Sequence, residues 1–183
     1  MKRLLLFAPL IVFVSLAVFF YAALEMRKTR SVEELDSALI GEAFPEFSLD
    51  NLNGEQVSRE DLVNGEVTLV NIWGSWCPSC VHEHPYLKML VDQGVRLVGI
   101  DYKDTPDEAR NWLSRFGDIY EFHIQDPAGR LGIDLGVYGA PETFIIDAEG
   151  VIRFKRVGIV DERVWTTQML PVYLEYGGQI DEG

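Results

Sequence analysis

Cysteine, histidine and basic residues are scarce in this chain. Its 183 residues include two cysteines, three histidines, and 16 Lys or Arg against 29 Asp or Glu. Two cysteines leave no second ligand pair for a structural zinc site, and the shortage of positive charge argues against nucleic acid as a partner. Internal repeats and low-complexity tracts are also absent, so the length favours one globular domain with a short appendage.

The excess of acidic over basic residues is concentrated after residue 30. That part of the chain holds 28 acidic and 11 basic residues, a net charge of −17. Such a surface can simply keep a domain soluble, or it can steer the domain toward basic segments of a partner.

The N-terminus contains one long hydrophobic run. Residues 4–24 carry no charge and would rise about 31 Å as a helix, enough to cross the core of a bilayer. Lys2 and Arg3 precede the run, as in a cleavable signal peptide, but it exceeds the usual h-region of about 7 to 15 residues. A buried core helix is disfavoured because the run has no polar face. We therefore expect a retained transmembrane anchor.

The charges around this run do not orient it. Lys2 and Arg3 lie on one side and Arg27, Lys28 and Arg30 on the other. The positive-inside rule therefore leaves the direction of the anchor open.

The remaining pattern predicts a single α/β domain. We expect an anchor with flanking charges at 1–30, a linker at 31–41, the domain at 42–178 and a tail at 179–183. Strands are expected at 67–73, 95–101, 122–125, 143–147 and 151–157. Helices are expected at 78–93, 105–116, 130–135 and 161–176, the last with a disturbance at Pro171. Strands alternating with helices and ending in a hairpin predict a mixed sheet with helices on both faces.

The two cysteines stand where a buried strand gives way to a helix. Cys77 and Cys80 enclose Pro78 and Ser79. A thiolate at a helix N-terminus is stabilised by unpaired NH groups and the helix dipole, so Cys77 is the expected nucleophile. Cys80, one turn deeper, is the expected resolving thiol. A purely stabilising disulfide is the alternative, although closing so short a loop removes little unfolded-state entropy.

Metal and haem sites fit the sequence less well. His82 and His84 follow the cysteines closely and His123 lies elsewhere, but a C-x-x-C-H haem attachment fails because Val81 stands where histidine is needed. A copper-handling variant is the remaining metal alternative. We expect His82 and His84 to be surface residues of the active-site helix.

Residues near the dithiol predict a groove for a partner chain. Trp76 is either core packing or part of a flat apolar rim. Pro141 is either an ordinary strand-entry proline or the site of a cis Ala140–Pro141 bond that presents a strand edge to a partner backbone. With Pro78, these residues form the expected substrate groove.

Several segments together resemble a known family. They are the N-terminal hydrophobic run, LVNIWGSWCPSC around the dithiol, EHP at 83–85, and GVYGAPETFIID at 136–147. Over residues 40–178 the chain resembles the thioredoxin superfamily, and more closely its CcmG/DsbE group of membrane-anchored thiol:disulfide interchange proteins used in cytochrome c maturation.

The resemblance implies a thioredoxin-like fold with an N-terminal hairpin, a helix–strand insert at 105–125 and a cis Pro141. It also implies an anchor in the inner membrane with the domain facing the periplasm. Electrons would come from a transmembrane reductase of the DsbD or CcdA type and would reduce disulfides of apocytochrome c or its handling proteins. No cofactor is implied.

One position departs from the wider superfamily. Many thioredoxins carry a buried aspartate six residues before the first cysteine, where this chain has Asn71. An amide cannot act as a general base, so Glu83 and Glu142 are the candidates for proton transfer. Carboxylates near a thiol raise its pKa and favour a reducing couple. The alternatives are a solvated helix residue for Glu83 and a surface charge for Glu142.

Two other functions stay open at this point. A general periplasmic thiol reductase or oxidase would use the same dithiol with other partners. A chaperone for apocytochrome or haem proteins would use the groove, and its cysteines would be secondary.

Overall fold

The computed structural model describes residues 12–21 and 39–181, and the chain divides into two compact units, Met1–Asp36 and Ser37–Gly183. In the first unit, residues 12–21 form a helix with exposed side chains. The rest of the predicted anchor, and the charges beside it, lie outside the described residues. Within the described ranges, no helix is both long and apolar enough to cross a bilayer.

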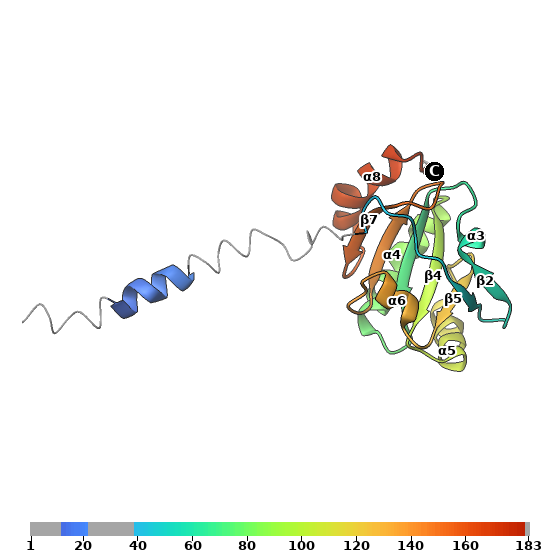
Figure 1. Cartoon of the computed structure of the whole chain (residues 1–183), viewed down its shortest axis with the longest axis horizontal. Coiled ribbons are helices and arrows are strands. Elements are labelled where there is room, and N and C mark those ends of the chain that lie inside the picture. The colour runs from blue at the N-terminus through green and yellow to red at the C-terminus, as the bar shows by residue number, and fades with distance from the viewer. Residues whose placement is uncertain (1–11, 22–38, 182–183) are drawn as a thin grey trace, which may run out of the picture. The chain divides into compact units, whose positions relative to one another are not determined.

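The second unit is built on a five-stranded mixed sheet (Figure 1). The strand order is β5 (His123–Asp126), β4 (Arg96–Tyr102), β3 (Thr68–Trp73), β6 (Glu142–Ile146) and β7 (Ile152–Val157). Strands β3, β4 and β5 are parallel, whereas β6 and β7 run antiparallel to their neighbours. Every residue of β3, β4 and β6 is buried, as their apolar sequences require for central strands. The predicted mixed sheet is confirmed.

Helices cover both faces of this sheet. They are α3 (Arg59–Leu62), α4 (Pro78–Asp92), α5 (Pro106–Phe116), α6 (Arg130–Asp134), α7 (Glu162–Val164) and α8 (Leu170–Glu175). A separate hairpin pairs β1 (Ser48–Asp50) with β2 (Gln56–Ser58). The long last helix expected at 161–176 is interrupted: a π-helical turn, Trp165–Met169, separates α7 from α8 just before Pro171.

Side chains alternate between two cores because successive strand residues point to opposite faces. Leu69 and Trp73 of β3 pack with α4, α5 and the C-terminal helices. Val70 and Ile72 pack with α3 and α6 on the other face. Asn71, between Leu69 and Trp73 in this alternation, therefore points toward α4.

The chain segments at both ends of the domain are bonded to it. Gly41 donates its NH to the carbonyl of Ile152 at 2.8 Å, and the buried Phe44 closes a second such bond to Gly150. At the other end, the NH of Asp181 donates to the carbonyl of Gln93 at 2.9 Å. Parts of the expected linker and tail thus pack on the domain.

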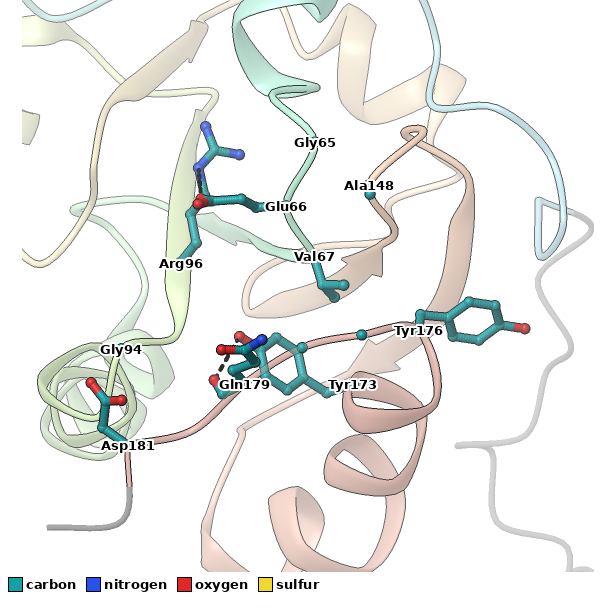
Figure 2. A pocket seen from close by; sticks show the side chains of 12 residues that line it. Gly65, Glu66, Val67, Gly94, Arg96, Ala148, Tyr173, Tyr176, Gln179 and Asp181 are labelled. Atoms are coloured by element: carbon teal, nitrogen blue, oxygen red, sulfur yellow. Dashed lines mark hydrogen bonds and ion pairs between the residues drawn. The ribbon is translucent and has the colours of Figure 1, made fainter.

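A polar cavity of about 540 Å³ opens between the sheet and the C-terminal segment. Figure 2 shows Glu66 and Arg96, which lie just before β3 and at the start of β4, together with Tyr173 and Gln179. The cysteines follow the other end of β3. This cavity is therefore not part of the dithiol site.

Candidate active site

The dithiol lies at the junction between β3 and α4. Cys77 is the N-cap of α4, as predicted, and its Sγ accepts a hydrogen bond from the NH of Cys80 at 3.1 Å. The two cysteines form a disulfide, and each is 2% exposed. Exposure therefore does not distinguish them. The N-cap position does, because the helix end stabilises a thiolate on Cys77.

The turn before Cys77 is tied to the end of β4. The NH of Ser75 donates to the Asp104 carboxylate at 2.5 Å, and Nε1 of Trp76 donates to the carbonyl of Tyr102 at 3.0 Å. A Cβ at Gly74 would lie 2.5 Å from Nε1 of Trp76, so a side chain at this position would displace the indole. Trp76 stays 48% exposed, so it is not a buried core residue, and the apolar rim expected of it stays a prediction.

Asn71 binds a carboxyl group instead of supplying one. Its Nδ2 donates to Oε1 of Glu83 at 2.9 Å and to Oγ1 of Thr143 at 3.0 Å, while its Oδ1 accepts from the Tyr120 hydroxyl at 2.9 Å. The other oxygen of Glu83 accepts from the NH of Val160 at 2.9 Å. Glu83 is 1% exposed and is not a solvated helix residue.

This environment tunes the pKa of Glu83. Burial raises the pKa to about 7, and the hydrogen bonds from Val160 and Asn71 and the charge of Arg156 only partly oppose the rise. Glu83 lies three residues after Cys80 on α4, so the two side chains share one face of the helix. A carboxyl on the same face of α4 as Cys80 can therefore take up or release a proton near neutral pH.

Glu142 is also buried, but its carboxylate binds a loop. Oε1 accepts from the NH of Tyr138 at 2.7 Å and of Gly139 at 3.3 Å. Oε2 pairs with Nζ of Lys155 at 3.0 Å, and Glu142 is 1% exposed. It is thus not a surface charge, and the proton-transfer role predicted for it stays a prediction.

A hollow of about 350 Å³ lies beside the dithiol. Ser79, residues 138–142 and residues 157–159 line it. The Ala140–Pro141 peptide bond in its wall is cis, as the resemblance implied. Trp76 and Pro78 are exposed next to the cysteines but do not line this hollow. Ala140 and Pro141 therefore face the space predicted for a partner chain, whereas the contribution expected from Trp76 and Pro78 stays a prediction.

Comparison with known proteins agrees with this arrangement. The Redoxin family matches residues 39–169. The thiol:disulfide interchange protein DsbE of Pseudomonas aeruginosa is 47% identical over 175 residues, covering 94% of each chain, and that of Escherichia coli K12 is 43% identical over 183 residues, covering 96% of this chain and 97% of the relative. A crystal structure of a putative DsbE from Chlorobium tepidum superposes with a TM-score of 0.62 at 26% identity, covering 73% of this chain and 96% of that one.

The chain belongs to the Redoxin family, in its DsbE group of thiol:disulfide interchange proteins. Its domain is thioredoxin-like, and its two cysteines, Cys77 and Cys80, form a C-x-x-C disulfide. The protein is a disulfide oxidoreductase.

One expectation about the histidines of this DsbE-group protein was wrong. His82 is exposed, but His84 is 4% exposed and packs edge-on against Trp112 with ring centroids 4.8 Å apart. The reason is helical spacing: His84 follows Cys80 by four residues and precedes Leu87 by three, so it shares their buried face. Burial lowers the pKa of His84, so the ring is a neutral core residue.

Sequence reasoning missed a second buried carboxyl group on the dithiol face of the sheet. Asp101 is 0% exposed at the end of β4, in register with Trp73, and its Oδ2 accepts from Nε2 of Gln125 at 2.8 Å. Burial raises its pKa to about 8, and the nearby Asp104 and Glu108 add to the rise. An aspartate at the end of a buried strand next to the cysteine-bearing strand is the sequence signal that could have found it.

Replacing Asp101 with asparagine is expected to stabilise the protein at alkaline pH. The folded-state pKa of about 8 lies above the ordinary 3.8, so the unfolded chain loses this proton first and wild-type stability falls as the pH rises between these values. Because one pKa unit corresponds to about 1.4 kcal/mol, the gain from Asp101→Asn should exceed about 2 kcal/mol at pH 8 and shrink toward pH 4.

Denaturant unfolding at both pH values, with the disulfide intact, measures this gain. Asp107→Asn is the matched control, because the Asp107 side chain is 98% exposed on the surface of α5. A gain that is the same at pH 4 and pH 8 would contradict the assignment of a raised pKa to Asp101.

Proposed function

We propose that this protein is a membrane-anchored reductase that faces the periplasm and reduces disulfides of apocytochrome c, or of its handling proteins, during cytochrome c maturation. In this proposal residues 4–24 retain the domain at the inner membrane. A transmembrane thiol reductase of the DsbD or CcdA type restores the reduced dithiol. The hollow that adjoins the dithiol carries the proposal, since it offers an extended polypeptide a place beside the reactive sulfur.

The proposed cycle balances in electrons and protons. The Cys77 thiolate attacks one sulfur of the partner disulfide, which forms a mixed disulfide and releases the other partner sulfur as a thiolate that takes up a proton. Glu83 accepts the proton of the Cys80 thiol. The Cys80 thiolate then attacks Sγ of Cys77 and leaves the Cys77–Cys80 disulfide. The second partner sulfur departs as a thiolate and takes up the proton held by Glu83. Two electrons pass to the partner, and the donor dithiol returns them.

The position of Glu83 favours reduction as the direction of exchange. Glu83 is buried one helical turn from Cys80, and an ionised carboxyl at this place raises the pKa of a neighbouring thiol. A thiol that ionises less readily gives a less stable reduced form and hence a more reducing couple. We therefore expect a reduction potential near that of reducing thioredoxins. A strongly oxidising value would sink the proposal in favour of an oxidase.

Trapping in cells tests the partner. A Cys80→Ala variant retains the attacking thiol but cannot resolve the mixed disulfide, so partners should accumulate on Cys77 and mass spectrometry should identify them. Apocytochrome c or a maturation protein is the expected result. Unrelated periplasmic proteins would point instead to a general reductase. Full cytochrome c maturation in a Cys77→Ser strain would replace catalysis with a binding role.

A further inference from the structure

Lys155 on β7 binds a loop that sequence reasoning did not connect with it. It pairs with Phe144 across the β6–β7 ladder, and its side chain is 6% exposed. Its Nζ donates to the carbonyls of Gly136 at 2.6 Å and Leu135 at 3.3 Å and forms an ion pair with Glu142 at 3.0 Å. Every one of these partners lies in residues 135–142, so one ammonium group holds both ends of that segment.

Glu142, the partner of Lys155 in the ion pair, also binds the middle of the segment 135–142. Its second carboxylate oxygen accepts from the NH groups of Tyr138 and Gly139. The Tyr138 ring lies over the ammonium, with Nζ 5.3 Å from the ring centroid, although the residue is 78% exposed. The ion pair thus fixes a loop that has no helix or strand of its own.

This loop forms one wall of the hollow beside the dithiol. Residues 138–142 line the hollow together with Ser79, which lies in the first turn of α4 between the two cysteines. Lys155 does not line it and is not placed to touch a partner there. Its influence on a partner chain must therefore pass through the backbone of the loop.

We propose that Lys155 is a positioning residue for polypeptide disulfides, which sets the backbone of residues 138–141 against which a partner segment lies during exchange at Cys77. This inference deepens the proposed function and rests on its polypeptide substrate. A small disulfide needs only the sulfurs at the start of α4. A polypeptide also needs the wall, and Lys155 determines the position of that wall.

The chemistry of the contacts explains why a lysine is needed. An ammonium group supplies three donors, which matches two carbonyls and one carboxylate. An apolar side chain of similar length would leave those oxygens unpaired and Glu142 as an uncompensated buried charge. The loop would then leave its position, while Cys77 and Cys80, on a different element, would keep theirs.

The test compares two disulfides in a reductase assay on the full chain. A peptide with an internal C-x-x-C-H disulfide probes the wall, and glutathione disulfide probes the dithiol alone. For Lys155→Met, kcat/KM with the peptide should fall about tenfold or more, mainly through a higher KM, because a misplaced binding wall weakens positioning. With glutathione disulfide, kcat/KM of Lys155→Met should stay within about twofold of the wild-type value, because the dithiol chemistry is intact.

Arg153→Met is the matched control. Arg153 lies two residues earlier on the same strand and is paired with Asp147 at 2.6 Å, away from the loop, so its loss should leave the ratio of the two substrates unchanged. If Lys155→Met does not fold, Lys155→Gln, whose amide can still donate to the carbonyls of residues 135 and 136 but carries no charge to pair with Glu142, carries the same expectation.

Each other outcome overturns the inference. A Lys155→Met variant that keeps its preference for the peptide shows that the loop does not need the ammonium. Equal losses on both substrates show an effect on the dithiol or the fold in general. A wild-type protein that reduces the peptide no better than glutathione disulfide would overturn the polypeptide substrate itself, and with it both this inference and the proposed function.

Discussion

Replacing Cys77 with serine is expected to lower the rate of disulfide reduction by at least about a thousandfold. A hydroxyl does not ionise near neutral pH, so the stabilisation that the start of α4 offers to a thiolate is lost together with the nucleophile. The remaining Cys80 lies inside the helix, where its sulfur lacks the N-cap position. Stopped-flow reduction of a disulfide peptide, starting from the reduced protein, measures the loss.

The Cys80→Ala variant is the matched control for this loss. It keeps the nucleophile and should form one mixed disulfide per molecule in a single turnover, after which the reaction stops. The Cys77→Ser variant should form none. If instead the Cys77→Ser variant formed the mixed disulfide, Cys80 would be the nucleophile and Cys77 the resolving thiol.

Replacing Glu83 with glutamine should slow the second half of the reaction by about a hundredfold at pH 7, within the usual range for loss of a general base. Because the pKa of Glu83 is about 7, the wild-type rate of mixed-disulfide resolution should rise as the pH increases through 7 and the carboxylate becomes available. In the Glu83→Gln variant, the increase in this rate around pH 7 should be absent. The rate should then rise only at higher pH, where the Cys80 thiol itself ionises.

Single-turnover release of a labelled peptide from Cys77, measured between pH 5 and pH 9, tests this dependence. The substitution suits the site, because a flip of the Asn71 amide lets its oxygen accept a hydrogen bond from the new amide. Asp92→Asn serves as the control, since Asp92 is an exposed residue at the end of the same helix. An unchanged profile in Glu83→Gln would rule out Glu83 as the proton acceptor.

Much of the fold could be predicted because its signals are local. Apolar runs of five to seven residues marked β3, β4 and β6, and all their side chains are buried. Helices were expected to begin at residues 105 and 161, and the side chains of Thr105 and Asp161 cap helices there: each accepts a hydrogen bond from the NH three residues later. The break between α7 and α8 was harder to place, because the π-helical turn depends on how Trp165 and Met169 pack in the core.

The sequence predicted which residues belong to the candidate site better than it predicted the contacts between them. The spacing of Cys77 and Cys80 after a buried strand was enough to predict a C-x-x-C pair at the start of a helix, and the structure places the two cysteines there as a disulfide. That spacing could not show that Asn71 bonds to Glu83, because the two residues are 12 positions apart and meet only when α4 packs on the sheet. The burial of His84 and Asp101 likewise depends on Trp112 and Gln125, which come from later elements.

By itself, the sequence determined the redox chemistry, because a nucleophilic thiol and its resolving partner need only a strand, a turn and the first turn of a helix. Tertiary structure decided how that chemistry is tuned. The pKa of Glu83 rises because distant elements exclude water from it, and the wall beside the dithiol keeps its shape because Lys155 reaches Glu142 across a strand pair. Desolvation and ion pairing depend on distances between elements, and folding alone sets those distances.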